Sequence, residues 1–293
     1  MSEKKQIAIA IASGKGGTGK TFVSTNIFQT LRNQGKQAIL VDCDAEVPND
    51  HTFFHFEKAH EQDVLEYRPV IDSERCTFCG KCVEFCEFKS IFYLPQLKQI
   101  KLLSNLCIGC GACSVACDED AISDGVTKVG KVSVWRENGK VAFIEGRMNE
   151  GEMSSVPIIK ETMKTAYNED ADYLIVDASP GASCPFIQTT TRVDFVLLVT
   201  EPTPFGLSDL KQAVDSLRIL GKPFGVIINR AGLGNRDIYD YLEKEQIRLW
   251  AEIPFDREIA RAYSEGKLMA DTSTAGGRVF EKLVNDLTER VWK

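Results

Sequence analysis

The sequence lacks several features that mark whole classes of protein. No apolar run approaches the roughly 18 residues that a membrane-spanning helix needs, so we expect no stable insertion into a membrane. Lysine and arginine are scattered without a polybasic run, and the formal net charge is −7. Because binding to nucleic-acid phosphates requires a basic surface, we expect no nucleic-acid partner. Internal repeats and low-complexity tracts are also absent.

The N-terminal residues do not read as a secretory signal. Lys4 and Lys5 precede a short apolar stretch, 7–12, which runs into a glycine-rich loop instead of a small-residue cleavage site. We therefore expect a cytoplasmic protein. Because a reducing compartment keeps thiols free, the ten cysteines indicate metal or redox chemistry rather than a disulfide framework.

Strand and helix patterns alternate over most of the chain. Residues 6–12 and 38–41 read as buried strands, and between them Val23, Ile27 and Leu31 recur at helical spacing. This βαβ unit predicts parallel strands. Further strands are expected over 173–176, 195–199 and 224–228, and helices over 155–167, 207–219, 237–246, 257–265 and 279–291. The expected fold is an α/β, doubly wound parallel sheet that binds its ligand at the carboxyl edge.

The alternation breaks in a cysteine-rich region. We expect residues 1–65 and 130–293 to form one discontinuous α/β domain, and residues 66–129 to form an inserted small α+β module. Beyond it, 131–135 and 141–145 flank an Asn-Gly pair, which favours a type I′ turn and predicts a hairpin.

The loop after the first strand reads GKGGTGKT and fits the pattern G-x-x-x-x-G-K-[ST] between a strand and a helix. Its glycines let backbone N–H groups converge on phosphate oxygens, and the helix N-terminus adds the positive end of its dipole. Lys20 should reach the β- and γ-phosphates, and the Thr21 hydroxyl should ligate Mg²⁺. The alternative is a glycine-rich turn that binds nothing. ATP or ADP is the expected ligand, bound by Gly14, Gly16, Gly17, Thr18, Gly19, Lys20 and Thr21.

The longer string SGKGGTGKT resembles the deviant Walker A loop of the MinD/Mrp/ParA class, which includes the nitrogenase iron protein. The resemblance implies a nucleotide-dependent homodimer in which Lys15 reaches the partner's nucleotide; a solvated loop lysine is the alternative. Asp42 and Asp44 stand where this class has switch I, which implies that Asp42 supports Mg²⁺ through water and that Asp44 orients the attacking water. The string VDASPG resembles switch II and implies that Asp177 lies in the outer shell of Mg²⁺. The implied catalytic residues are Lys15, Lys20 and Asp44.

Two further strings carry the resemblance. In IINR, Asn229 matches a strand-end asparagine that reads the adenine edge, and in IPFD, Pro254 belongs to the loop that packs near the base. The resemblance covers residues 6–49 and 157 to the C-terminus.

Eight cysteines form two runs with the spacing C-x₂-C-x₂-C-x₃-C. Such a run wraps three thiolates around one face of a [4Fe–4S] cluster, and in two-cluster ferredoxins the fourth cysteine ligates the other cluster. The spacing therefore predicts two clusters. One would be held by Cys76, Cys79, Cys82 and Cys117, and the other by Cys107, Cys110, Cys113 and Cys86.

The region 71–126 resembles bacterial-type ferredoxins. Zinc is the alternative, but zinc sites use paired knuckles and four ligands, not two triplets with two single cysteines. Gly80, Gly109 and Gly111 would allow the backbone to approach sulfur closely. The proline that usually follows each fourth cysteine is replaced by Glu87 and Asp118, which bears on cluster potential rather than on ligand number.

Several lone residues admit two interpretations. Cys184 follows the switch II string at a place where the nitrogenase iron protein has a cluster ligand, so it is either a redox ligand or a small residue at a helix start. Cys43 is expected to pack. His51 and His55 stand four residues apart, which favours a solvated or packed helix over a metal site. The amphipathic stretch 279–292 lacks a basic face, so we expect it to pack on the sheet.

These patterns together predict an enzyme that hydrolyses ATP to ADP and phosphate. In the favoured hypothesis, an ATP-dependent homodimer couples hydrolysis to electron transfer through two clusters to a partner protein. The alternative is an Mrp-type ATPase that assembles or carries a cluster for an apo-protein acceptor. A third hypothesis, a MinD/ParA-like positioning ATPase, does not account for the cysteine module.

Overall fold

The alternating residues of strand β1 (Ile7–Ala12) show how the body of the protein is layered. In this computed structural model, which describes residues 6–272 and 274–291, Ala8 and Ala10 are buried on one face of the sheet, and Ile9 and Ile11 are buried on the other. Successive side chains of a strand point to opposite faces. A strand that is apolar on both faces must be covered on both, so the sheet lies between two layers of helices.

Within the described residues, nine strands form one sheet in the order β11-β10-β9-β1-β8-β2-β7-β6-β3. From β11 to β7 the neighbouring strands are parallel, which confirms the parallel α/β prediction for this part. Besides β1, the parallel strands are β2 (Ala38–Cys43), β7 (Lys140–Met148), β8 (Tyr173–Ala178), β9 (Phe195–Thr200), β10 (Phe224–Ala231) and β11 (Leu249–Pro254).

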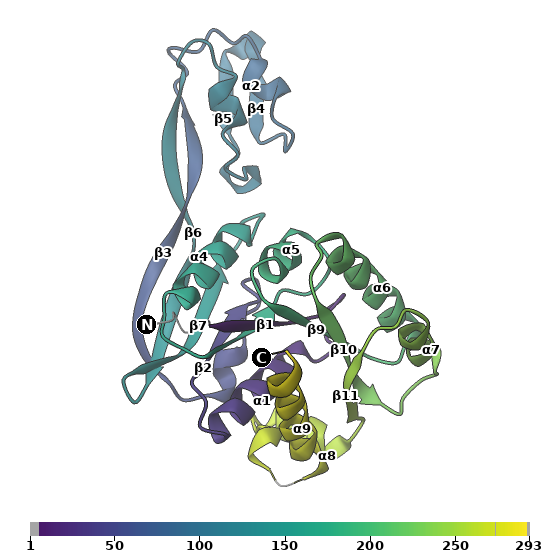
Figure 1. Cartoon of the computed structure of the whole chain (residues 1–293). Helices are drawn as coiled ribbons and strands as arrows, with labels where there is room; N and C mark the ends of the chain where they lie inside the picture. Colours follow the sequence, from purple (N-terminus) through teal and green to yellow (C-terminus); the bar gives the residue numbers. More distant parts are fainter. Residues whose placement is uncertain (1–5, 273, 292–293) are drawn as a thin grey trace.

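The helices divide between the two faces, as Figure 1 shows. The face with Ala8 and Ala10 packs against α4 (Val156–Tyr167), α5 (Cys184–Thr190), α6 (Pro204–Ile219) and α7 (Asp237–Lys244). The face with Ile9 and Ile11 packs against α1 (Lys20–Asn33), α8 (Arg257–Ser264) and α9 (Ala275–Arg290). Helix α9 therefore packs on the sheet, as the absence of a basic face predicts; Trp292 lies outside the described residues.

Beyond β7 the sheet is antiparallel, and the hairpin predicted from the Asn-Gly pair is confirmed there. Strand β6 (Ile122–Glu137) pairs with β7 as the predicted hairpin, and β3 (Glu57–Ile71) pairs antiparallel with β6 along its whole length. These two strands extend beyond the body as a twisted ribbon (Figure 1). Residues 66 and 129, the expected limits of the insertion, fall inside β3 and β6.

The ribbon carries the cysteine-rich module at its far end (Figure 1). The module contains two short helices that follow the second cysteine of each run, α2 (Lys81–Glu84) and α3 (Ala112–Val115), and a hairpin of β4 (Ile91–Leu94) and β5 (Gln99–Leu102). Gly80 and Gly111 begin the two helices with φ of 80° and 75°, values that favour glycine. The 3₁₀ turns of the chain are η1 (Asp50–Phe53), η2 (Pro95–Leu97), η3 (Ser104–Leu106) and η4 (Met269–Asp271).

The helix expected around His51 and His55 is wrong. His51 belongs to the short turn η1, the chain is extended at Phe54, and His55 lies between η1 and β3. His51 instead lies beside Glu145 of β7, with 3.2 Å between Nδ1 and Oε2. Across residues 6–272 and 274–291, none of the helices combines the length and the apolar character needed to span a bilayer.

Helix α4 packs closely on the sheet because Gly146 has no side chain. A Cβ atom there would lie 2.3 Å from Thr162 Oγ1 and 2.8 Å from Ile158 Cγ2, both on α4. We predict that Gly146→Ala lowers the free energy of unfolding by about 1–3 kcal/mol through overpacking, measured by denaturant unfolding. Lys160→Ala on the exposed face of α4 is the control and should stay within about 0.5 kcal/mol of wild type. Equal stability of the two variants would contradict the prediction.

Candidate functional site

The loop between β1 and α1 lies at the carboxyl edge of the sheet. Gly17 and Gly19 adopt φ of 78° and 96°, which an L side chain rarely does. Gly14 passes close to α6, because a Cβ atom there would lie 2.2 Å from the Asp209 carbonyl oxygen. The Ser13 hydroxyl donates to the Lys15 carbonyl at 2.6 Å and helps to hold the loop in this shape. Glycine at these positions is therefore a steric requirement.

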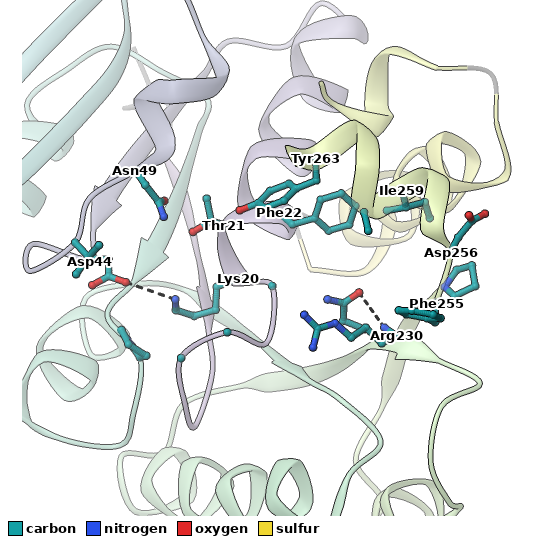
Figure 2. Close-up of a pocket in the computed structure, with 18 residues that line it drawn as sticks. Lys20, Thr21, Phe22, Asp44, Asn49, Arg230, Phe255, Asp256, Ile259 and Tyr263 are labelled. Carbon is teal, nitrogen blue, oxygen red and sulfur yellow. Dashed lines mark hydrogen bonds and ion pairs between the residues drawn. The ribbon is translucent and has the colours of Figure 1, made fainter. Parts of the chain in front are cut away.

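A cavity of about 360 Å³ opens beside this loop. Lys20 and Thr21 at the start of α1 and Asp44 after β2 line it (Figure 2). Asn229 of β10 and Pro254 of β11, which lie far from them in the sequence, line it as well. Gly16, Gly17 and Gly19 also line it, whereas Gly14, Lys15 and Thr18 do not.

Charged side chains meet at one end of the cavity. Lys20 Nζ lies 3.7 Å from Asp44 Oδ2, and the Thr21 hydroxyl donates to Asp177 Oδ2 at 2.7 Å (Figure 2 shows the first contact). Burial lowers the pKa of Lys20, but the negative charges of Asp177 and Asp44 outweigh it and the pKa is raised overall. The lysine is therefore held as a cation that faces the cavity.

Asp42 closes the loop that follows β2. Its carboxylate accepts backbone N–H bonds from Asp44 at 3.0 Å, Asn49 at 3.0 Å and Asp50 at 3.2 Å. The pairing of β2 with β8 places Asp42 directly opposite Asp177. The Ser179 hydroxyl donates to the Cys43 carbonyl at 2.8 Å, so the segment after β8 is tied to the end of β2.

Three carboxyl groups meet without solvent at this point. Asp42, Asp50 and Asp177 are fully buried, and each offers an oxygen within 4.8 Å of the others. Among the described residues no N–H or hydroxyl group donates to either oxygen of Asp50 or to Asp177 Oδ1. Negative charges on carboxyls this close repel one another unless the groups hold protons. A divalent cation would supply the missing charge, because carboxylates are ligands that hard cations prefer.

Burial is the largest cause of the pKa shifts of these acids. It raises the pKa of Asp42 and Asp50 well above the usual range. The charge of Asp177 adds to the effect on both, and the charge of Asp42 adds to the effect on Asp50. Burial also raises the pKa of Asp44 to about 6, although Lys20 acts in the opposite direction.

Asn229 is engaged with the loop. Its Nδ2 donates to the Thr18 carbonyl at 2.8 Å, its Oδ1 accepts the N–H of Arg230 at 2.9 Å, and a Cβ atom on Gly19 would lie 2.3 Å from Nδ2. Pro254 ends β11 on the wall of the same cavity. Both residues therefore border the cavity, and Asn229 supports the loop as well.

Lys15 points toward its own chain. Its Nζ lies 3.1 Å from Glu201 Oε1, and Arg230 donates to Glu201 Oε2 at 2.7 Å. Glu201 directly follows β9, and its side chain is only 12% exposed. One carboxylate thus binds both cations. Lys15 could reach a partner chain only after its contact with Glu201 is broken.

Sequence reasoning missed several residues of the cavity. Phe22 and Tyr263 form an edge-to-face pair with ring centroids 5.5 Å apart, and Ile259 lies near them on the wall (Figure 2). Asp50 and Glu201 were also missed. An acid shortly after a strand can indicate a residue near the site at the carboxyl edge of the sheet. The same pattern is also typical of ordinary turns and helix caps, so it does not single these residues out.

The module at the end of the ribbon contains two cysteine-lined cavities. One is lined by Cys76, Cys79, Cys82 and Cys117, and the other by Cys86, Cys107, Cys110 and Cys113. Backbone N–H groups point to sulfur in both: that of Phe78 to Cys76 Sγ at 3.4 Å, and that of Gly109 to Cys107 Sγ at 3.4 Å. Each cavity therefore has four sulfur atoms of one chain around it.

The remaining cysteines lie elsewhere. Cys43 is fully buried, which agrees with a packing role, and burial raises its pKa well above the usual range. Cys184 is exposed at the first position of α5 and lines neither the P-loop cavity nor the cysteine-lined cavities.

The family model of the CobQ/CobB/MinD/ParA nucleotide binding domain matches residues 9–269 of the chain. The chain belongs to this family. Nucleotide binding follows from the family, and we expect it in the cavity beside the P-loop, which is called the nucleotide site below. The fold is also similar to the septum site-determining protein MinD complexed with Mg-ADP from Pyrococcus horikoshii, with a TM-score of 0.58 and 18% identity over 97% of this chain and 96% of that one.

Two relatives match nearly the whole chain. The uncharacterized protein MJ0579 of Methanocaldococcus jannaschii is 30% identical, over 91% of this chain and 92% of its own length. An iron-sulfur cluster carrier protein of Pyrococcus furiosus is 24% identical, over 98% of this chain and 89% of its own length.

The buried acids predict how stability depends on pH. An acid whose pKa is higher in the folded than in the unfolded protein binds more protons when folded, so the free energy of unfolding falls as pH rises between the two values. Without Mg²⁺ and nucleotide, stability should fall from about pH 4, the unfolded pKa of aspartate, to about pH 6 through Asp44, and it should fall further at higher pH through Asp42 and Asp50. Thermal unfolding across this pH range checks the expectation.

Mg²⁺ should reverse the loss, by about 2.7 kcal/mol at 100 times its Kd. Asp50→Asn removes one of the buried charges. We expect this variant to be more stable than wild type at pH 8 without Mg²⁺ and to gain less stability from Mg²⁺. A variant that is less stable than wild type at pH 8 and gains equally from Mg²⁺ would contradict the electrostatic interpretation.

Proposed function

We propose that the chain hydrolyses ATP as a nucleotide-dependent homodimer, and that nucleotide state is coupled to electron transfer through two [4Fe–4S] clusters to a partner protein. Residues 66–129 are the inserted cluster-binding domain in this proposal, and residues 1–65 and 130–293 form the ATPase domain. The observation that carries it is the pair of cavities, each lined by four cysteines, on a ribbon continuous with the sheet of the nucleotide site.

The residues of the module fit [4Fe–4S] clusters. A [4Fe–4S] cluster takes four cysteine thiolates, and each cavity presents four. Burial raises the pKa of Cys86, but hydrogen bonds from the hydroxyl and N–H of Ser90 and from the N–H groups of Phe88 and Lys89 outweigh it together, and the pKa is lowered. Such donors favour the thiolate that a cluster requires. When bound, a cluster of this type supplies one-electron transfer.

The chain's own residues account for the nucleotide chemistry. The P-loop N–H groups and Lys20 hold the phosphates, and the oxygen of Thr21 can ligate Mg²⁺ while its proton bonds to Asp177. Asp44 lies beside Lys20, where it can orient the attacking water. Asp42 and Asp177 would support a bound Mg²⁺ through water. Asn229 and Pro254 line the cavity, where they would lie beside the adenine.

The first experiment measures whether the two activities depend on each other. Anaerobically purified protein should contain about eight iron atoms per chain. We predict that reduction of the clusters with dithionite changes the ATPase rate, and that the EPR signal of the reduced clusters differs between Mg-ATP and Mg-ADP. An ATPase rate that is independent of reduction, together with an EPR signal that is independent of nucleotide, would refute the coupling.

The role of Lys15 can be tested by mixing variants. Lys15→Ala and Lys20→Ala should each hydrolyse ATP poorly alone. If Lys15 serves the partner's nucleotide, a mixed dimer keeps one complete site, in which the Lys15→Ala chain binds ATP and its partner supplies Lys15. We expect the mixture to recover up to about a quarter of the wild-type rate, because random pairing makes half of the dimers mixed. No recovery at any mixing ratio would count against action in trans.

A second function, cluster assembly or delivery to an apo-protein acceptor, is favoured by the similarity to the iron-sulfur cluster carrier protein. The two proposals differ in how firmly the clusters are held. Four cysteines of one chain around each cavity support retention. Transfer of iron to an apo-ferredoxin in the presence of ATP, without chelator and faster than spontaneous loss, would favour the carrier function. A role for Cys184 in either process stays a proposal.

A further inference from the structure

Arg68 lies on β3 where the ribbon meets the cysteine module, and it is only 5% exposed. Its Nη2 donates to Glu152 Oε2 at 3.0 Å, and its Nη1 donates to the carboxylate of Glu66 and to the Tyr67 carbonyl, the latter at 3.0 Å. A buried guanidinium thus joins the loop before α4 to the base of the module. Glu66 and Glu152 share this guanidinium, and breaking either contact removes part of the compensation of a buried charge, so the three residues tend to stay together.

On the side of the body, the contact leads to the nucleotide site. Glu152 belongs to the loop that follows β7, and the N–H of Met148 at the end of β7 donates to the Ala45 carbonyl at 2.9 Å. Ala45 follows Asp44, which faces Lys20 in the cavity. The N–H of Asn149 also donates to the carbonyl of Val129 on β6 at 2.9 Å. A displacement of the loop after β2 therefore acts on the segment 148–152.

On the side of the module, the contact leads to the second cysteine-lined cavity. A Cβ atom on Gly109 would lie 2.9 Å from Glu66 Cγ and 2.9 Å from the Tyr67 carbonyl oxygen, so the Cys107–Cys113 loop lies against both residues. The hydroxyl groups of Tyr67 and Ser114 are hydrogen-bonded. Pro69, next to Arg68, lines the cavity of Cys86, Cys107, Cys110 and Cys113.

We propose that the Arg68–Glu152 ion pair transmits nucleotide state to the cysteine loop 107–113, and that the two residues are positioning residues for the second cluster. The inference rests on the proposed function. Ordering of switch loops by nucleotide is a common way to move a second surface. Here the moving segment reaches the module through one buried ion pair, and the bonds of Arg68 to Glu66 and Tyr67 carry the displacement to the loop.

The chain offers a matched control. Gln62 Nε2, on the same strand as Arg68, lies 3.3 Å from Glu161 Oε1 and 3.0 Å from Thr165 Oγ1 on α4. Glu161→Gln therefore removes a carboxylate that also joins the ribbon to the body, but at a point nearer the middle of the ribbon. Glu152→Gln makes the same chemical change at the proposed Arg68–Glu152 ion pair.

The test compares hydrogen exchange of residues 105–117 in the holoprotein with Mg-ADP and with a non-hydrolysable Mg-ATP analogue. In wild type and in Glu161→Gln we expect the exchange rates to differ at least about fivefold between the two nucleotides, the lower end of common allosteric couplings. In Glu152→Gln the difference should fall below about twofold, with iron content and basal ATPase close to wild type. Arg68→Lys keeps the charge but not the fork of donors, and it should behave like Glu152→Gln.

The outcomes separate the two levels of the proposal. If Glu152→Gln and Arg68→Lys keep the full difference in exchange, the ion pair does not transmit nucleotide state, and the coupling must follow another route. If wild type itself shows no difference in exchange and no nucleotide effect on the cluster EPR signal, the proposed coupling fails and the inference fails with it. If Glu161→Gln also loses the difference in hydrogen exchange between the two nucleotides, any loosening of the ribbon from the body abolishes the coupling. The assignment to Arg68 and Glu152 is then overturned.

Discussion

The register of β2 against β8 is the constraint on which the nucleotide site depends. It places Asp42 opposite Asp177 at the carboxyl edge of the sheet, and η1 brings Asp50 to the same point, so three carboxyl groups are buried together. Burial of uncompensated charge is costly, and in the free chain Lys20 is the cation that faces this group. The surrounding backbone N–H bonds to Asp42 hold the arrangement in place. Without a bound cation these carboxyls escape mutual repulsion only by holding protons, so we expect stability to depend on both pH and ligand.

The antiparallel ribbon attaches the cysteine module to the α/β body. Strands β3 and β6 pair with each other along the whole of β3, so each has a hydrogen-bonded neighbour where the ribbon leaves the sheet, and water can satisfy the groups on the outer edges. At its far end Ile71 pairs with Ile122, and both pack against the small core of the module. The two ends of the insertion therefore lie side by side, which lets the body keep its fold around it.

Much of the body could be predicted from hydrophobic patterns, because its strands are buried on both faces and its helices on one. Strands β3 and β11 were missed for a physical reason. Residues 57–63 of β3 are mostly exposed, so no alternation of apolar and polar residues marks them, and β11 is an edge strand that is partly exposed. The helix expected at His51 and His55 was wrong because spacing alone does not show that Asp42 binds the backbone of this segment into a turn.

The sequence by itself determined the features that depend on neighbouring residues. The P-loop is one such feature, because its shape comes from glycines within a few positions, and the cysteine triplets are another, because their spacing sets the reach of a single loop. Only the tertiary structure decided which residues from other parts of the chain contact these loops. The meeting of Asp50 with Asp42 and Asp177, the hold of Glu201 on Lys15, and the ion pair between Arg68 and Glu152 all join residues from separate strands or loops. Such contacts depend on strand register and on the path of the ribbon, which many residues set together and no local pattern records.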